Sequence, residues 1–316
     1  MLYQIGVDIG GTFIKIGLFD DSLRLLSKTS IPFPHTDAGQ MADRLRAAID
    51  DTLARYEIAL CDVSSIGVVL PGSIDPSRQI AVNAYNLDYH NVPLKKILCE
   101  RFPETPVFLA NDADAAALAE LYQGAFQGCR SAVLLTLGTG VGGGIILDGH
   151  MFRGGCGNGI EIGHVFLLDG GDPCTCGNHG CIESYCSATA LANAGKQAMR
   201  GDPGGMLASA CGGDEEKLDA ELVTDCAKAG DPAALAVFNA FAGHLSSACA
   251  SVFNFLDPQV IAIGGGLCAA GDFLFSRLHE ATDRKCFFKN HGIIVPAALG
   301  NDAGIIGAAL LQRDAT

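Results

Sequence analysis

Residues 5–20 read IGVDIGGTFIKIGLFD, and this stretch decides the fold of the first part of the chain. Two apolar runs flank the turn Gly10-Gly11-Thr12, a pattern that predicts two strands joined by a tight turn. After a polar stretch, MADRLRAAIDDTLARY (residues 41–56) carries apolar residues at helical spacing. The chain is therefore expected to begin as strand, turn, strand and helix.

The alternation of strands and helices continues downstream. SIGVVLPG (residues 65–72) and TPVFLAND (105–112) predict buried strands. VPLKKILCERF (92–102) and the Ala-rich ADAAALAELYQGAF (113–126) predict helices, and the second helix is expected to end near Gly124. This order of elements indicates an α/β fold.

A second glycine-rich segment, LTLGTGVGGGIILDG (residues 135–149), resembles the opening stretch. Asp8 and Thr136 begin the two turns, and Asp20 and Asp148 follow them at the same spacing. The match favours an internal duplication, although two glycine-rich hairpins can also arise independently.

Length and charge limit the possible functions. The chain has 316 residues and is 49% apolar, which favours two domains. Its formal net charge of −14 argues against nucleic-acid binding, because such binding depends on clustered Lys and Arg. Backbone amides and a divalent cation would therefore have to hold any anionic ligand. Residues 199–217, rich in Gly, Asp and Pro, predict a long surface loop.

No membrane span is expected, because apolar runs such as residues 66–70 and 260–263 are far too short to cross a bilayer. The N-terminal sequence MLYQIGVDIGGT lacks the features of a secretory signal, so we expect a cytoplasmic protein. The 13 cysteines are odd in number and scattered from Cys61 to Cys286. Most of them are expected to be buried thiols rather than disulfides.

Three glycine-rich turns are candidate phosphate-binding sites. In residues 8–12 (DIGGT) the glycines allow a phosphate close to the backbone, and Asp8 can hold a hydrated magnesium ion. Residues 138–144 (GTGVGGG) hold more glycine than a strand tolerates unless something approaches the backbone. Gly264-Gly265-Gly266 lies between a predicted strand and a predicted helix. Neither of the first two turns fits the P-loop pattern, and glycine can also serve a purely steric role.

Asn111 and Asp112 end a predicted strand immediately before a helix, where open α/β sheets bind ligands. A carboxylate in this position can act as a base. The alternative role is helix capping, for which Asn and Asp are favoured. Because Asp114 can cap the helix equally well, we expect Asp112 to be available for chemistry.

The stretch DPCTCGNHGCIES (residues 172–184) gathers three cysteines that are candidate zinc ligands. A structural zinc site needs four nitrogen or sulfur ligands, and Cys174, Cys176 and Cys181 supply three. Free cysteines in a glycine-rich turn are the alternative, but the nearby prolines and glycines and the lack of apolar residues favour zinc. Spacing leaves three candidates for the fourth ligand: His179, Cys186 and His164.

Together these motifs resemble the ROK family of sugar kinases over essentially the whole chain. The family signature Cys-x-Cys-Gly-x-x-Gly-Cys-x-Glu matches CTCGNHGCIE (residues 174–183). The family's Glu-x-Gly-His matches EIGH (161–164), and its Asn-Asp pair matches residues 111–112. With the first phosphate motif at residues 8–12, all four agree in order and spacing.

The resemblance implies an actin-like, hexokinase-type (ribonuclease H-like) fold with two α/β domains and a ligand cleft between them. The smaller domain would comprise residues 1–112 and 302–316, and the larger one residues 113–301 with the zinc-binding loop. The last helix, GIIGAALL (304–311), would cross back to the first domain. The oligomeric states common in the family also imply a homodimer or homotetramer.

The same resemblance implies an ATP-dependent kinase that phosphorylates the primary hydroxyl of a hexose, with Asp112 as general base and with ATP, Mg²⁺ and structural Zn²⁺ as cofactors. It makes His164 the fourth zinc ligand, so that zinc fixes the wall of the sugar pocket. The implied sugar-binding residues are Gly72, Asn86, Asn111, Asp112, Glu161, His164 and Glu183. The implied ATP- and magnesium-binding residues are Asp8, Gly10, Gly11, Thr12, Lys15, Gly138, Thr139, Gly140, Gly264, Gly265 and Gly266. The implied zinc ligands are His164, Cys174, Cys176 and Cys181.

Glucose is the expected substrate, because NLDYHNVPL from Asn86 is similar to glucokinase-type members. Those members usually carry Gly before Glu-x-Gly-His, and Ile160 at this position leaves N-acetylmannosamine, N-acetylglucosamine, mannose, fructose and allose open. Repressors of the family carry an additional DNA-binding domain, for which this acidic chain has no room. Intact Asp8 and Asp112 oppose a non-catalytic sugar sensor, and the length of the chain opposes a lone zinc-ribbon module.

Overall fold

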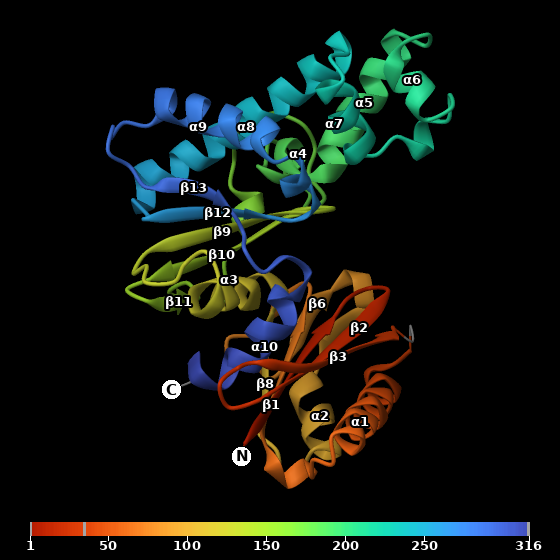
Figure 1. Ribbon diagram of the computed structural model, residues 1–316, viewed down its shortest axis with the longest axis vertical. Coiled ribbons are helices and arrows are strands. Elements are labelled where there is room, and N and C mark those ends of the chain that lie inside the picture. The colour runs from red at the N-terminus through yellow and green to blue at the C-terminus, as the bar shows by residue number, and fades with distance from the viewer. Residues whose placement is uncertain (1, 34–35, 315–316) are drawn as a thin grey trace. The chain divides into compact units, whose positions relative to one another are not determined.

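The computed structural model describes residues 2–33 and 36–314 (Figure 1). Residues 1, 34, 35, 315 and 316, which belong to the expected first domain, lie outside the described residues. The strands are β1 (Tyr3–Ile9), β2 (Phe13–Phe19), β3 (Leu25–Pro32), β4 (Val63–Leu70), β5 (Ser73–Ile74), β6 (Ala81–Ala84), β7 (Tyr89–Val92), β8 (Val107–Asn111), β9 (Ala132–Leu137), β10 (Val141–Leu147), β11 (His150–Phe152), β12 (Val260–Gly264) and β13 (Ile293–Pro296). The helices are α1 (Ala38–Arg55), α2 (Leu94–Arg101), α3 (Asp112–Gln123), α4 (Glu183–Cys186), α5 (Ala188–Gly201), α6 (Met206–Ala210), α7 (Ala220–Lys228), α8 (Pro232–Leu256), α9 (Asp272–Lys285) and α10 (Ala303–Asp314).

The opening stretch forms the antiparallel hairpin that the sequence predicts. β1 pairs with β2 so that Asp8 lies opposite Lys15. The sheet has the order β3-β2-β1-β4-β8, in which β1, β4 and β8 run parallel. Leu70 at the end of β4 is therefore aligned with Asn111 at the end of β8, where the two parallel strands end together.

A second five-stranded sheet repeats this arrangement, with the order β11-β10-β9-β12-β13. β12 runs parallel to both β9 and β13, and β10 is antiparallel to β11. The strand order supports the predicted internal duplication, because β9 and β10 take the positions that β1 and β2 hold in the first sheet. The mixed α/β fold is confirmed.

The chain forms two compact units. Unit 1 contains residues 1–128, 144–160 and 298–316, and unit 2 contains residues 129–143 and 161–297. These limits differ from the boundaries expected after residues 112 and 301. α3 belongs to unit 1 because it packs closely on α10, where a Cβ on Gly307 would lie 1.8 Å from the Ala115 carbonyl oxygen.

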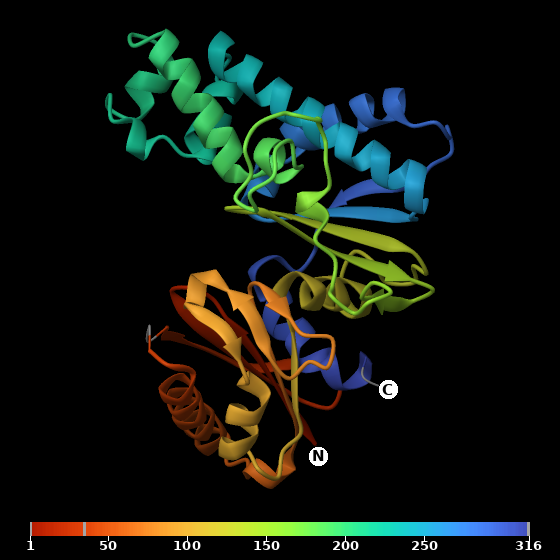
Figure 2. The same ribbon diagram turned by 180° about the vertical axis from the view of Figure 1, so that it is seen from behind.

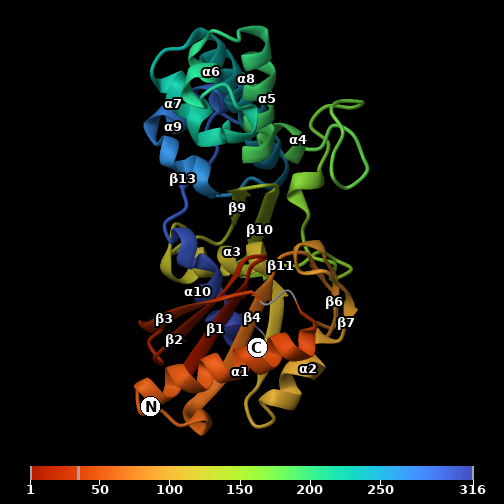
Figure 3. The same cartoon turned by 90° about the vertical axis from the view of Figure 1, so that its right-hand side faces the viewer.

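In unit 1, α1 and α2 cover one face of the sheet and α10 covers the other (Figures 1 and 3). α1 starts at Ala38, three residues earlier than the apolar pattern indicates, because the Asp37 side chain caps it by accepting hydrogen bonds from the amides of Gly39 and Gln40. On the opposite face, Cβ atoms on Gly6 and Gly67 would lie 1.9 and 1.8 Å from carbonyl oxygens of α10. Glycine at these positions lets the helix backbone rest directly on the strands.

In unit 2, α5, α7, α8 and α9 form the helical layer (Figure 2). The loop expected over residues 199–217 contains the short helix α6, because Leu207 and Ala208 are buried and anchor it. Within the described residues, α8 is the one helix long and apolar enough to cross a membrane by length and composition, although the sequence predicts no such segment. Half of its most apolar window is buried inside the protein, and buried core helices meet the same criterion.

Candidate active site and metal centre

Asp8 lies near the end of β1, two residues before the first glycine-rich turn of unit 1. Its Oδ2 is 3.5 Å from Lys15 Nζ, and Lys15 also donates to the Asn301 carbonyl oxygen at 3.3 Å. Burial raises the pKa of the Asp8 carboxyl, and Lys15 opposes this rise. A partly buried carboxylate beside glycines can bind a cation, which suits the predicted magnesium role.

Asn111, rather than Asp114, provides the side-chain cap at the start of α3. Its Oδ1 accepts from the amides of Ala113 (2.7 Å) and Asp114 (3.2 Å), and its Nδ2 donates to the Gly72 carbonyl oxygen at 2.9 Å. The expectation that Asp114 can take the cap is therefore corrected, because its side chain follows the first helical amides instead of preceding them. Asp112 Oδ1 accepts from the Ala113 amide at 2.9 Å.

Two other predicted residues of unit 1 are also neighbours. A Cβ on Gly11 would lie 3.4 Å from the Asn86 carbonyl oxygen, so the first turn contacts the segment that follows β6. Asn86 itself is exposed. Unit 1 thus contains two local groups, one around Asp8, Lys15 and Gly11 and one around Gly72 and Asn111.

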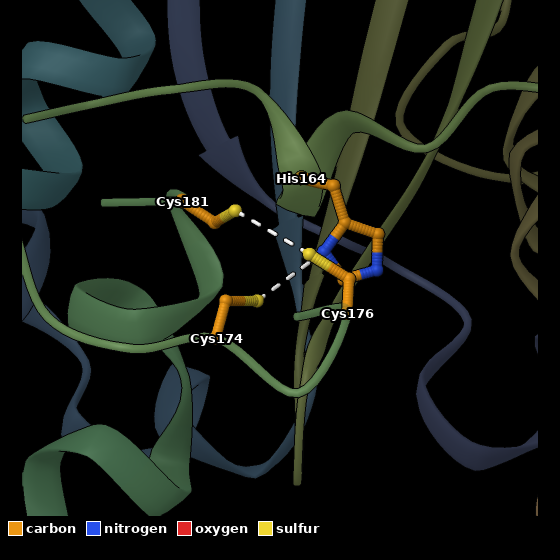
Figure 4. A group of neighbouring side chains, drawn as sticks. All are labelled: His164, Cys174, Cys176 and Cys181. Atoms are coloured by element: carbon orange, nitrogen blue, oxygen red, sulfur yellow. Dashed lines mark hydrogen bonds between the residues drawn. The ribbon is translucent and has the colours of Figure 1, made fainter. Parts of the chain in front are cut away.

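Unit 2 contains a cluster of one His and three Cys side chains. His164, Cys174, Cys176 and Cys181 offer ligand atoms that all lie within 4.8 Å of one another, and Figure 4 shows them converging. His164 Nδ1 is 3.5 Å from Cys174 Sγ, and Cys176 Sγ is 3.8 Å from Cys181 Sγ. Ligand atoms that share a tetrahedral zinc, with Zn–S near 2.3 Å and Zn–N near 2.0 Å, lie about 3.5–3.8 Å apart. The four residues therefore fit a zinc ion.

Without a bound ion, the thiol of Cys181 favours its protonated form. Burial raises the pKa of Cys181 to about 12, and the thiols of Cys174 and Cys176 add to the rise. A divalent ion would instead stabilise the thiolate forms. Of the three candidates for the fourth ligand that spacing leaves open, the structure brings His164, the residue that the resemblance implies, close to the three cysteines. Cys186 is buried in α4 and His179 is outside the cluster.

Glu183 lies next to the metal cluster and has partners at both carboxylate oxygens. Oε1 accepts from Thr175 Oγ1 at 2.7 Å, and Oε2 accepts from the Val141 amide at 3.0 Å. Glu161 is exposed, yet the surrounding protein raises the pKa of its carboxyl by desolvation, while nearby His164 lowers it and Glu183 raises it further. The three predicted sugar-binding residues of unit 2 are thus close enough to interact electrostatically.

The second and third glycine-rich turns lie side by side in unit 2. Gly264 pairs with Thr136, and a Cβ on Gly265 would lie 2.1 Å from the Leu137 carbonyl oxygen. Thr139 and Gly266 line the same cavity of about 430 Å³. That volume falls in the range of small-molecule sites, so the two turns form one candidate nucleotide pocket.

Sequence reasoning missed the other walls of this cavity. They come from α5, from α7 and from the residue that caps α7, and they include Thr189, Asp219, Glu221, Asp225 and Lys228. These residues belong to no short motif, and only the packing of α5 and α7 brings them to the glycine-rich turns.

Known proteins resemble this chain along nearly its whole length. The family model described as ROK family matches residues 4–315. A glucokinase of Halalkalibacterium halodurans is 35% identical over 98% of this chain and 95% of its own. A ROK family glucokinase from Streptomyces griseus, whose structure was solved in complex with glucose and AMPPNP, is 32% identical, with a TM-score of 0.82 and 98% of each chain covered.

Regulatory proteins also resemble this chain, over part of their own length. An N-acetylglucosamine repressor of Escherichia coli is 31% identical over 98% of this chain but 75% of its own length. Similarity of this degree therefore extends to both kinases and repressors. Since the family model covers almost every residue, this chain belongs to the ROK family.

Proposed function

We propose that this protein is an ATP-dependent hexose kinase that phosphorylates the primary hydroxyl of its sugar, with glucose as the first candidate. The observation that carries the proposal is similarity to glucokinases over nearly the full chain, in a protein that retains Asp8 and Asp112. The pair of glycine-rich turns beside a cavity of about 430 Å³ supports a nucleotide site.

Asp112 is the proposed general base. It accepts the proton of the primary hydroxyl as that oxygen attacks the γ-phosphoryl group in line, while the bond from the γ-phosphorus to the bridging oxygen breaks and ADP leaves. Asp112 is the first residue of α3, so its carboxylate lies at the positive end of the helix dipole. Asn111 caps the same helix and is tied to Gly72, so the segment that carries the base is held on both sides.

Asp8 and the glycine-rich turn around Gly10, Gly11 and Thr12 are the residues that would hold Mg²⁺ with the phosphates. When bound, Mg²⁺ neutralises charge on the phosphoryl group. Lys15, held between Asp8 and the Asn301 carbonyl, adds a positive charge at this position. In unit 2, the turns at Gly138–Gly140 and Gly264–Gly266 offer backbone amides to the nucleotide.

The hexose hydroxyls are assigned to Gly72, Asn86, Asn111, Asp112, Glu161, His164 and Glu183. Because His164 Nδ1 points toward Cys174, its Nε2 is left for a sugar hydroxyl. Zn²⁺ held by His164 and the three cysteines would fix the orientation of this ring. A site lined by such donors and acceptors rejects analogues that lack a hydroxyl.

The identity of the hexose is a separate question. Ile160, directly before Glu161, is bulkier than the glycine typical of glucose-type members, so N-acetylmannosamine, N-acetylglucosamine, mannose, fructose and allose are the alternative substrates. A sugar sensor without catalysis is the second candidate function, favoured by the similarity to an N-acetylglucosamine repressor.

The test is ADP release by the purified protein with MgATP across a panel of these hexoses and N-acetylhexosamines. The proposal predicts that one sugar drives turnover well above the rate without sugar. Binding of a panel sugar, seen by calorimetry, with no turnover for any of them would instead support the sensor.

A further inference from the structure

Glu183 connects residues 172–182, called the metal loop below, to the glycine-rich turn that precedes β10. Its Oε2 accepts from the Val141 amide at 3.0 Å, and a Cβ on Gly140 would lie 2.3 Å from this oxygen. The absence of a side chain at Gly140 therefore allows the carboxylate to lie directly against the turn. A hydrogen bond to a charged group is stronger than one between neutral groups. The bond from the Val141 amide to Glu183 therefore restrains the turn where it enters β10.

The other carboxylate oxygen of Glu183 faces the metal loop. Thr175 Oγ1 donates to Oε1 at 2.7 Å, and Cys174 Sγ lies 3.7 Å from the same oxygen. Thr175 stands between two metal ligands, Cys174 and Cys176. The position of its hydroxyl therefore depends on how the loop is folded, and the loop that carries it projects beside α4 (Figure 3).

Two further contacts join the same segments. The Ala188 amide at the start of α5 donates to the Gly138 carbonyl oxygen at 2.8 Å. On the His164 side, a Cβ on Gly163 would lie 2.0 Å from the Val141 carbonyl oxygen. Both chain segments that supply metal ligands thus pack against the turn at residues 138–141. Thr139, in the middle of that turn, lines the cavity of about 430 Å³.

We propose that Glu183 is a positioning residue through which the metal loop sets the conformation of the Gly138–Gly140 turn, so that metal loading strengthens nucleotide binding. The inference rests on the proposed function, because it assigns the nucleotide to this turn. Ordering the loop aligns the Thr175 hydroxyl, the hydroxyl holds Glu183, and Glu183 holds the Val141 amide. A nucleotide then binds a turn that is already ordered, which reduces the entropy lost on binding.

The test is calorimetric binding of MgADP without sugar to the metal-loaded protein, the chelator-treated protein and the Thr175→Val variant. Thr175→Val removes the hydroxyl but keeps all four metal ligands and the size of the side chain. We expect the Kd for MgADP to rise about threefold to tenfold in the variant and in the chelator-treated protein. Thr175→Ser, which keeps the hydroxyl, is the matched control and should stay within about twofold of the unmodified protein.

Combining the two changes tests the route. Chelation should weaken MgADP binding less in Thr175→Val than in the unmodified protein, because both changes act through Glu183. An unchanged Kd in a metal-loaded Thr175→Val variant would overturn the inference while leaving the kinase proposal intact. Failure of the unmodified, metal-loaded protein to bind MgADP would contradict the proposed nucleotide site itself, and this inference with it.

Discussion

Folding places the Asp8 carboxyl group in surroundings that disfavour its ionised form. Burial raises its pKa despite the nearby Lys15 ammonium. A carboxyl with a higher pKa in the folded protein stabilises the fold fully only below its unfolded pKa of about 3.9, and this contribution is lost as the pH rises through the folded value. At neutral pH the ionised Asp8 therefore lowers the free energy of unfolding.

Replacing Asp8 by Asn should consequently raise the melting temperature of the ligand-free protein at pH 7.5, by about 1–3 °C. The gain should shrink as the pH falls toward 4, because Asp8 then becomes neutral as well. Differential scanning calorimetry at both pH values measures this. Asp88→Asn is the control, since Asp88 is a 99% exposed side chain whose left-handed backbone suits Asn equally well. A lower melting temperature for Asp8→Asn at pH 7.5 would contradict the account.

Single residues were predictable where a short motif carries its own chemistry. The convergence of Cys174, Cys176 and Cys181 could be predicted because thiols at this spacing have few uses other than metal binding. The residue that caps α3 could not be predicted, because Asn111 and Asp114 are chemically similar and only the backbone geometry distinguishes them. Thr175 could not be predicted for another reason. Its proposed role depends on the contact with Glu183, and neither residue type indicates that contact in the sequence.

Among the elements, α10 can pack directly on the first sheet only because glycine occupies strand positions that face the helix. A Cβ on Gly67 would lie 1.8 Å from the Ala308 carbonyl oxygen, which is part of the helix backbone and cannot turn aside. Gly67→Ala should therefore lower the free energy of unfolding by about 1–3 kcal/mol, measured by urea denaturation. Gly201→Ala is the matched control, because nothing lies within 4 Å of its added Cβ. Equal urea midpoints for the two variants would show that α10 is not packed this closely.

Residues 172–179 of the metal loop include no buried residue, so a bound ion should contribute much of the loop's stability. Cys176→Ser removes one of the four ligands and should reduce the metal content from about one ion per chain to a small fraction of that. The melting temperature should fall by at least about 5 °C. Elemental analysis and calorimetry measure the two effects.

Cys156→Ser controls for loss of a thiol, because Cys156 is exposed and lies outside the cluster. Its metal content and melting temperature should match those of the unmodified protein. Full metal content in Cys176→Ser would remove that residue from the ligand set.

Elements with strong periodicity or motifs were predictable, and their ends were less so. The hairpin of β1 and β2 followed from two apolar runs around Gly10 and Gly11. The short helix α6 did not, because its glycine-rich surroundings indicate a loop and its buried anchors act only in the tertiary structure. The start of α1 also depends on a single capping side chain, that of Asp37.

For the whole molecule, the sequence indicates two domains because a chain of this length and apolar content exceeds one core. The duplicated glycine-rich segments also predict the repeated strand order of the two sheets. The limits of the two units depend instead on long-range packing, such as that of α10 against α3, which no local pattern encodes. The walls that α5 and α7 contribute to the candidate nucleotide cavity could not be predicted for the same reason.

The central claim is that this chain phosphorylates a hexose with Asp112 as the base. The most direct measurement is kcat for MgATP-dependent phosphorylation of the best panel sugar, together with the Kd for that sugar, in Asp112→Asn. Asp114→Asn, which removes a second carboxylate from the same helical turn, is the control and should keep kcat within about tenfold. We predict that Asp112→Asn lowers kcat by about 10²–10⁴-fold while the sugar Kd changes less than about threefold. Turnover comparable to that of the unmodified protein would contradict the account.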